Sequence, residues 1–328
     1  MNGTSTADLL AANLLSPFVL AFTLGVVAKR LGSNLSLSKD VYDGLSTYLL
    51  LAIGLKGGAR IAQAPVDQLL APTGAALALG LITPVVAFAV LRLAGRLSRV
   101  DAGAIAAHYG SVSAVTFIAA QSLVEQRGDV TEPFLPALLA IMEVPGLVVG
   151  LALGITGPGR GDRPLRQVFH EIVLGKTLVL LLGGLVIGAA VGVERLAPVQ
   201  PFFEGLFPGA LTLFLLELGV VAGARLGDLR RIGPFLLGFG TVVPIVHGVL
   251  GVLLGSWAGL SVGGATVLGA MAASASYIAA PPAVRLALPD ANPTYYLTAA
   301  LAITFPFNLI AGIPLYYWTA LWVAERMT

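Results

Sequence analysis

Long apolar runs constrain this chain more than any other feature of its sequence. Hydrophobic residues make up 57% of its 328 residues and charged residues only 11%, against about 25% charged in a typical soluble domain. A soluble protein of this size needs more surface charge than the sequence supplies, so we expect an integral membrane protein. Soluble enzymes are therefore poor alternatives, and no nucleic-acid partner is expected.

The apolar runs also predict the number and type of the membrane crossings. A membrane-spanning helix needs about 20 mostly apolar residues, and continuous runs, unlike runs that alternate with a period of two, favour helices. The predicted fold is therefore all-α, with ten transmembrane helices near residues 9–28, 44–62, 69–91, 101–124, 134–155, 171–193, 206–224, 232–257, 262–282 and 294–322.

The basic residues predict how the chain is oriented in the membrane. If the N-terminus lies outside, the inner segments hold fourteen of the 19 Lys and Arg residues, as the positive-inside rule requires. Both termini are therefore expected outside a plasma (inner) membrane. Met1 to Ala12 lack a basic stretch, so no secretory signal is expected. The chain has no cysteine, which excludes disulfides and thiolate chemistry.

The two halves of the chain repeat the same motifs in the same order. The four matches, at shifts of 160 to 165 residues, pair Ile53–Arg60 with Leu218–Arg225, Thr83-Pro84 with Val243-Pro244, Ser111-Val-Ser113 with Ser274-Ala-Ser276, and Pro145 with Pro306. Because each copy holds five spans, an odd number, the second copy must enter the membrane from the opposite face. This is the inverted repeat of many secondary transporters. The predicted division is residues 1–155 for the first repeat, 156–170 for a short basic cytoplasmic linker and 171–328 for the second repeat.

The fourth and ninth spans are predicted to be broken helices that form a substrate site. Each carries two hydroxyls two residues apart, Ser111 and Ser113 in one and Ser274 and Ser276 in the other. Residues two apart on a regular helix point about 200° apart, so only an unwound stretch lets both serve one ligand. A helix N-terminus at such a break offers N–H groups to an anion, and freed carbonyls hold a small cation. The alternative is that each serine bonds back to a carbonyl of its own helix.

Three other polar residues lie well inside apolar runs. Burying a carboxylate at mid-membrane costs at least about 2.5 kcal/mol, so Glu143, beside Pro145, is expected to serve an ion or to organise the core. Glu217 is expected either to have such a function or to pair with a basic group such as Lys56. Asn308 either lends a carbonyl to an ion or bridges two helices.

The histidines carry no sign of metal chemistry. His108 and His247 are each isolated in the sequence, so a packing role is expected for both. The chain has no His-x-x-x-His or Glu-x-x-His spacing, and no metal site other than one for sodium is predicted.

Four segments resemble the sodium-dependent bicarbonate transporter family known from cyanobacteria: Tyr48–Gly58, Ala107–Phe117, Met142–Gly146 and Ser274–Pro281. The resemblance runs from about residue 10 to residue 322. It implies a ten-span carrier with a core and a gate domain, usually a homotrimer, that takes up bicarbonate by symport with sodium. Sodium is then the coupling ion, and no other cofactor is implied.

The resemblance also implies which residues form the site. Bicarbonate would be held at the two breaks by Gly110, Ser111, Val112, Ser113, Ser274, Ala275, Ser276 and Tyr277. The sodium ligands are expected among Thr116, Ser113, Ser276, Glu143 and Asn308, and the motif does not fix how the hydroxyls divide between anion and cation.

The central loop departs from the family pattern. Cyanobacterial members have a longer loop and a PII-like regulatory protein that binds on the cytoplasmic side, whereas here the loop is short, from about Thr156 to His170. Its basic residues Arg160, Arg163 and Arg166 either bind such a partner or serve only as a topology signal.

Three other functions remain as alternatives. A carrier of the same fold could take another small anion, such as sulfate or a carboxylate. A passive anion channel would need no coupling ion. An intramembrane enzyme is not expected, because the sequence offers no nucleophile–base pair and no metal cluster.

Overall fold

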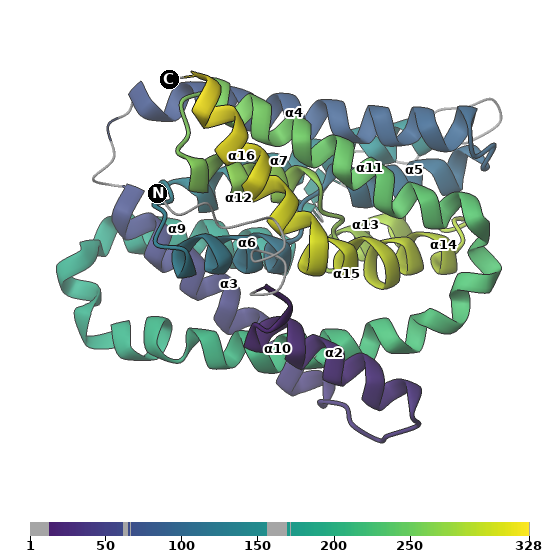
Figure 1. The fold of residues 1–328 in the computed structure, drawn as a ribbon, viewed down its shortest axis with the longest axis horizontal. Helices are drawn as coiled ribbons and strands as arrows, with labels where there is room; N and C mark the ends of the chain where they lie inside the picture. Colours follow the sequence, from purple (N-terminus) through teal and green to yellow (C-terminus); the bar gives the residue numbers. More distant parts are fainter. Residues whose placement is uncertain (1–12, 62–64, 66, 156–168, 171, 328) are drawn as a thin grey trace.

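The computed structural model describes residues 13–61, 65, 67–155, 169–170 and 172–327 (Figure 1). These residues form an all-helical protein in which helices make up 84% and no strand is present within the described ranges. The longer helices are α2 (Pro17–Arg30), α3 (Lys39–Ile61), α4 (Asp67–Leu93), α5 (Arg99–Gly110), α6 (Ala114–Gln126), α7 (Leu135–Ile155), α9 (Lys176–Leu196), α10 (Phe207–Arg225), α11 (Leu229–Trp257), α12 (Val262–Ala272), α13 (Ala280–Ala287) and α16 (Ile313–Met327).

Short helical segments connect or interrupt the longer helices. The 3₁₀ turns η1 (Ala197–Val199) and η3 (Leu226–Asp228) and the π turn η2 (Pro201–Gly205) join α9, α10 and α11. The last crossing begins with α14 (Pro293–Thr298), η4 (Ala299–Thr304), α15 (Phe305–Phe307) and η5 (Asn308–Gly312), of which η4 and η5 are π-helical.

Six helical stretches in the described residues are long and apolar enough to span a membrane. They are Gln68–Leu93, Arg99–Gln126, Leu135–Ile155, Lys176–Val199, Phe207–Trp257 and Pro293–Met327. The stretch of 51 residues from Phe207 to Trp257 contains both α10 and α11; at 1.5 Å per residue it is roughly 75 Å long, more than twice the hydrocarbon thickness of about 30 Å. By contrast, α2 has only 14 residues and α12 only 11. A multi-pass helical membrane protein is therefore confirmed, and the count of ten crossings stays a prediction.

Glycines join four of the helices into one group. α3 packs along α9, and α2 packs along α10. A Cβ on Gly54 of α3 would lie 2.9 Å from the Cα of Gly184 in α9, and one on Gly219 of α10 would lie 3.1 Å from the Cα of Gly25 in α2. Only residues without a side chain let two backbones approach this closely. We name α2, α3, α9 and α10 the frame bundle.

The remaining long helices form a second group, which we name the core bundle. In it α5 packs between α4 and α7, and α12 packs against α11, α16 and α6. Figure 1 shows α2 and α10 at one edge of the molecule and α4 and α11 at the opposite edge, with α16 running from that edge toward the middle. The predicted fourth and ninth spans both lie in the core bundle, and both are interrupted.

The interruptions fall at the serine motifs. α5 ends at Gly110 and α6 begins at Ala114, with Ser111 in an extended conformation (φ −85°, ψ 160°) between them. α12 ends at Ala272 and α13 begins only at Ala280. We call residues 111–113 the first break and residues 273–279 the second break.

Candidate functional site

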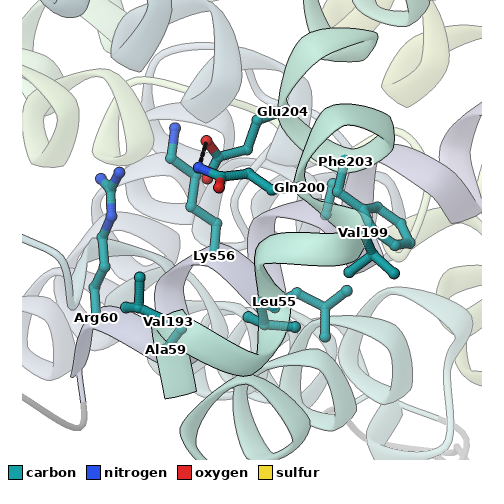
Figure 2. Close-up of a pocket in the computed structure, with 11 residues that line it drawn as sticks. Leu55, Lys56, Ala59, Arg60, Val193, Val199, Gln200, Phe203 and Glu204 are labelled. Atoms are coloured by element: carbon teal, nitrogen blue, oxygen red, sulfur yellow. Dashed lines mark hydrogen bonds between the residues drawn. The ribbon is translucent and has the colours of Figure 1, made fainter. Parts of the chain in front are cut away.

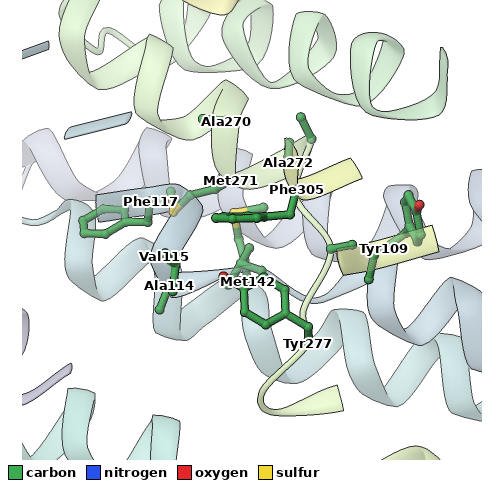
Figure 3. Packing of buried hydrophobic residues seen from close by; sticks show 14 of the residues in the cluster. Tyr109, Ala114, Val115, Phe117, Met142, Ala270, Met271, Ala272, Tyr277 and Phe305 are labelled. Atoms are coloured by element: carbon green, nitrogen blue, oxygen red, sulfur yellow. The ribbon is translucent and has the colours of Figure 1, made fainter. Parts of the chain in front are cut away.

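One hydrogen bond joins the two breaks, and a second joins the second break to the last turn of α5. The backbone N–H of Ser113 donates to the Ser274 hydroxyl oxygen at 2.8 Å, and the N–H of Ser276 donates to the His108 carbonyl at 2.8 Å. All four residues are buried. Figure 3 shows apolar side chains packed around this crossing, among them Phe117, Met142, Met271 and Phe305. The two serine motifs, 163 residues apart in sequence, therefore meet inside the core bundle.

The second serine of each motif accepts a hydrogen bond from the first turn of the helix that follows it. The Ser113 hydroxyl oxygen accepts a hydrogen bond from the backbone N–H of Thr116 at 3.2 Å, at the start of α6. The Ser276 hydroxyl oxygen accepts one from the N–H of Ala280 at 3.3 Å, at the start of α13. The Ser276 hydroxyl donates to no other group in the described residues, so its proton is available to a ligand. The Ser113 hydroxyl interacts with that of Tyr277, which also faces the cavity. Hydroxyl donors at the positive ends of two helices favour an anion.

These two serines face one cavity. It is tight, with a volume of about 10 Å³, room for about one water molecule, and it lies where the two breaks meet α7 and α9. Of the eight predicted anion ligands, Val112, Ser113, Ser276 and Tyr277 line it. The Tyr277 hydroxyl is buried. The remaining lining residues are Ala114, Glu143, Thr177, Ile278 and Ala279.

A larger hollow adjoins this cavity. It has a volume of about 640 Å³ and shares Glu143, Thr177, Ile278 and Ala279 with the smaller cavity. Its far side is lined by His170 and by the residues at the start of α9. The cavity at the breaks is therefore connected to the end of the molecule at which α9 begins.

The other four predicted anion ligands, Gly110, Ser111, Ser274 and Ala275, are not among the residues that line the cavity. The Ser274 hydroxyl accepts from Ser113 and donates to the Met271 carbonyl at 2.7 Å. For Ser274, the alternative of a bond back to its own helix is thus the one observed. The Ser111 hydroxyl is buried without a hydrogen-bond partner among the described residues.

The predicted sodium ligands divide in the same way. Ser113, Ser276 and Glu143 line the cavity, whereas Thr116 and Asn308 do not. Glu143 is 1% exposed, and its Oε2 atom has no hydrogen-bond partner in the residues that the structure describes. A buried carboxylate oxygen without a partner is costly in a membrane, and it marks Glu143 as a functional residue.

Asn308 links two elements of the core bundle. Its Nδ2 donates to the Ala273 carbonyl at 2.8 Å, and its Oδ1 accepts from the Tyr316 hydroxyl at 3.0 Å. Of the two roles considered for Asn308, the bridge between helices is the one observed.

The predicted pairing of Glu217 with Lys56 is wrong. The Glu217 Oε2 atom accepts a hydrogen bond from the backbone N–H of Leu37 at 2.7 Å. Lys56 instead lies 3.8 Å from Glu125. A peptide N–H just before α3 satisfies the buried carboxylate, so no basic side chain is needed there.

His108 has the packing role expected for it. Its Nδ1 lies 2.7 Å from the Ala104 carbonyl, and its ring stacks on that of Tyr296 with centroids 4.6 Å apart. His247 is also buried, in α11. No group of three or more His, Cys, Asp or Glu residues that could hold a metal ion occurs in the described ranges.

A separate pocket lies within the frame bundle, between α3 and the turns that follow α9 (Figure 2). Lys56 and Arg60 line it opposite Gln200 and Glu204, whose side chains hydrogen-bond to each other at 2.8 Å. This pocket contains no residue of either break, and Gln200 is paired with Glu204 and Lys56 with Glu125. We therefore take the cavity at the breaks as the candidate site.

Sequence reasoning missed Thr177, Ile278 and Ala279. Ile278 and Ala279 extend the second break beyond its serines. Thr177, the second residue of α9, stands at the start of an ordinary apolar span and has no serine-type motif around it. Only the packing of α9 beside the breaks brings this hydroxyl into the cavity.

A comparison with protein families matches almost the whole chain to one family. A family model described as the Na⁺-dependent bicarbonate transporter superfamily matches residues 17–321. No curated protein matches the chain. The matched region includes both breaks and all residues that line the cavity, and it confirms the resemblance seen in the sequence motifs.

Proposed function

The chain belongs to the Na⁺-dependent bicarbonate transporter superfamily, and on this premise we propose that it is a secondary carrier that couples inward movement of sodium to uptake of bicarbonate across the plasma membrane. One observation carries the proposal. The Ser113 and Ser276 hydroxyls come from opposite halves of the chain, each accept a hydrogen bond from the first turn of the helix that follows, and line one cavity. The residues supply binding groups for an ion rather than a nucleophile and a base, which favours transport over catalysis.

In this proposal, bicarbonate binds where the two breaks meet. The Ser113 and Ser276 hydroxyls donate to its oxygens, and the positive end of α6 adds a favourable field. Gly110 and Ser274 do not face the cavity and instead hold the unwound segments in place.

Sodium binds beside the anion and neutralises its charge. The only acidic side chain that lines the cavity, among the described residues, is that of Glu143. Carboxylate and hydroxyl oxygens are suitable ligands for a hard cation, and a cation next to an anion is strongly stabilised where water is excluded.

The packing of the helices supports the proposed inverted repeat of ten spans. The repeat exchanges α3 with α10 and α9 with α2, and the pairs α3–α9 and α10–α2 pack in the same way, glycine on glycine. The repeat also relates the packed pair α4–α5 to the packed pair α11–α12, and the packed pair α5–α7 to the packed pair α12–α16. We assign the core bundle to the core domain and the frame bundle to the gate domain, and we propose that their relative movement gives alternating access.

Three further features of the proposal rest on loop charge or on the family. Both termini lie outside in the orientation that the positive-inside rule favours. The homotrimer and a PII-like regulatory partner on the cytoplasmic face follow from the family resemblance. The basic residues Arg160, Arg163 and Arg166 lie outside the residues that the structure describes.

Uptake of radiolabelled bicarbonate into proteoliposomes tests the proposal. With an inward sodium gradient, we expect bicarbonate to accumulate above equilibrium; with an equal potassium gradient, it should not. Equal uptake without accumulation in both salts would indicate a channel. Competition by unlabelled sulfate or a carboxylate, with no effect of unlabelled bicarbonate, would indicate a carrier for another anion.

A further inference from the structure

Glu143 and Thr177 line the same cavity from different bundles. Glu143 belongs to α7 in the core bundle, and Thr177 belongs to α9 in the frame bundle. Both are buried, at 1% and 6% exposed, and both line the cavity at the breaks as well as the adjoining larger hollow. They are therefore placed where the two bundles meet.

The Glu143 carboxylate needs a positive partner that the surrounding side chains do not supply. Lys176, next to Thr177, donates to the Asp43 carbonyl at 2.7 Å and lies 3.8 Å from the Asp43 carboxylate. The ammonium group of Lys176 is therefore paired with Asp43 and not with Glu143. No ion pair or hydrogen bond of Glu143 Oε2 is found in the described residues. An unpaired carboxylate in a water-poor site is strongly unfavourable, and a bound cation removes that cost.

The hydroxyl groups of the cavity divide into two chemical sets. Ser113 and Ser276 use their oxygens to accept from the first turns of helices, and the Ser276 proton is left to donate, which suits an anion. The Thr177 hydroxyl lies at the start of α9, where no side chain caps the helix, and no hydrogen bond of this hydroxyl is found among the described residues. Its oxygen lone pairs are thus available on the side of the cavity where the carboxylate lies.

We infer that a hard monovalent cation binds between the Glu143 carboxylate and the Thr177 hydroxyl and so ties the core bundle to the frame bundle. The inference rests on the proposed function, because it locates the coupling sodium and adds a ligand from the gate domain. It also removes Thr116 and Asn308 from the set of predicted sodium ligands, since neither residue lines the cavity.

Such a site gives coupling a structural basis. If one ligand belongs to each bundle, the cation binds tightly only when the two bundles are together. A ligand shifts a conformational equilibrium by its difference in affinity for the two states. Sodium would therefore favour the state in which the cavity is closed around the anion.

Sodium-dependent thermal stabilisation of the purified full-length protein, measured without bicarbonate and against potassium, tests the inference. We expect Thr177→Val to raise the half-saturating sodium concentration tenfold or more, Thr177→Ser to leave it near the wild-type value, and Glu143→Gln to abolish the effect. Thr266→Val is the matched control, because the buried Thr266 hydroxyl donates to Val262 of its own helix α12, at 2.7 Å.

The outcomes separate this inference from the proposed function. A wild-type response to sodium that persists unchanged in Thr177→Val would overturn the shared site and leave sodium coupling intact. A wild-type protein that responds to neither sodium nor a sodium gradient would overturn both.

A second measurement covers the case in which Thr177→Val does not fold. The chain has no cysteine, so Ala279→Cys, in the wall of both cavities, introduces a single thiol. We expect sodium to slow labelling of this thiol when Glu143 is present but not in the Glu143→Gln background. Labelling that is equally fast with and without sodium would overturn the inference.

Discussion

The two breaks have matching sequence motifs but are held in place by different means. At the first break, the backbone of Gly110 packs against that of Gly146 in α7, so closely that a Cβ on Gly146 would overlap the Gly110 carbonyl. The equivalent carbonyl at the second break, that of Ala273, accepts a hydrogen bond from the Asn308 side chain at 2.8 Å. Close backbone contact thus holds one break, and an amide side chain holds the other.

The serines show which part of the repeat is symmetric. Ser113 and Ser276 both accept a hydrogen bond from the helix that follows and both line the cavity. Ser274 joins the two breaks through its hydroxyl, whereas the Ser111 hydroxyl has no partner in the described residues. The repeat is therefore symmetric where a ligand would bind and asymmetric in the groups that support the site. Substitutions in the supporting groups should affect stability differently in the two halves.

The largest effect is expected at Gly146. Gly146→Val would place a branched side chain against the Gly110 backbone and force α5 away from α7. Because backbone atoms cannot move aside as a flexible side chain can, we expect a loss of about 3 kcal/mol or more of stability. Thermal unfolding of the purified protein measures it. Gly183→Val is the control, since nothing lies within 4 Å of a Cβ there; equal stability of the two variants would contradict the account of the first break.

A smaller effect is expected at Asn308. Asn308→Leu removes the donor to the Ala273 carbonyl and leaves a buried backbone group unpaired, which costs about 1–3 kcal/mol. Tyr316→Phe removes the hydroxyl's bonds to Asn308 Oδ1 and to the Pro244 carbonyl but leaves the Asn308 donor to Ala273 in place, so it should cost less. Thermal unfolding of both variants tests whether Asn308→Leu loses more stability than Tyr316→Phe. If Tyr316→Phe is as destabilising as Asn308→Leu, the amide does not hold the second break.

The smallest effect is expected at Ser111, the first serine of the first motif. Ser274→Ala leaves the buried Ser113 N–H unpaired and removes the bond to the Met271 carbonyl, a loss of about 1–3 kcal/mol. Ser111→Ala removes no hydrogen bond to the described residues and should leave the unfolding temperature unchanged. Equal losses in the two variants would mean that the breaks are supported alike.

The sequence predicted the breaks because their signal is local and repeated. Paired hydroxyls in an apolar span are unusual, and their recurrence in the second half marks Ser113 and Ser276 as equivalent. The ninth apolar run, predicted to be broken, consists of the 11 residues of α12, a break and the short α13. Hydropathy measures burial in the membrane and does not detect an unwound segment.

The partners of the buried polar groups could not be predicted, because they depend on packing between distant segments. Glu217 bonds to a backbone N–H, and any residue type offers such a donor. Thr177 enters the cavity only because α9 packs beside the breaks. Which serine of each motif faces the ligand was likewise fixed by the hydrogen bonds to the first turns of α6 and α13, not by the spacing of the motif.

Binding of radiolabelled bicarbonate to the purified protein in saturating sodium, compared between the wild type and Ser276→Gly, tests the central claim most directly. Because Ala279 and not Ser276 is the N-cap residue of α13, this change removes the hydroxyl and one hydrogen bond, from the Ala280 N–H at 3.3 Å, at a cost of about 1 kcal/mol. A hydrogen bond to a charged group contributes about 1.5–3 kcal/mol. We therefore expect bicarbonate to bind about tenfold or more weakly to Ser276→Gly and normally to Ser276→Thr. An unchanged affinity in Ser276→Gly would contradict the claim that the Ser113 and Ser276 hydroxyls hold the anion.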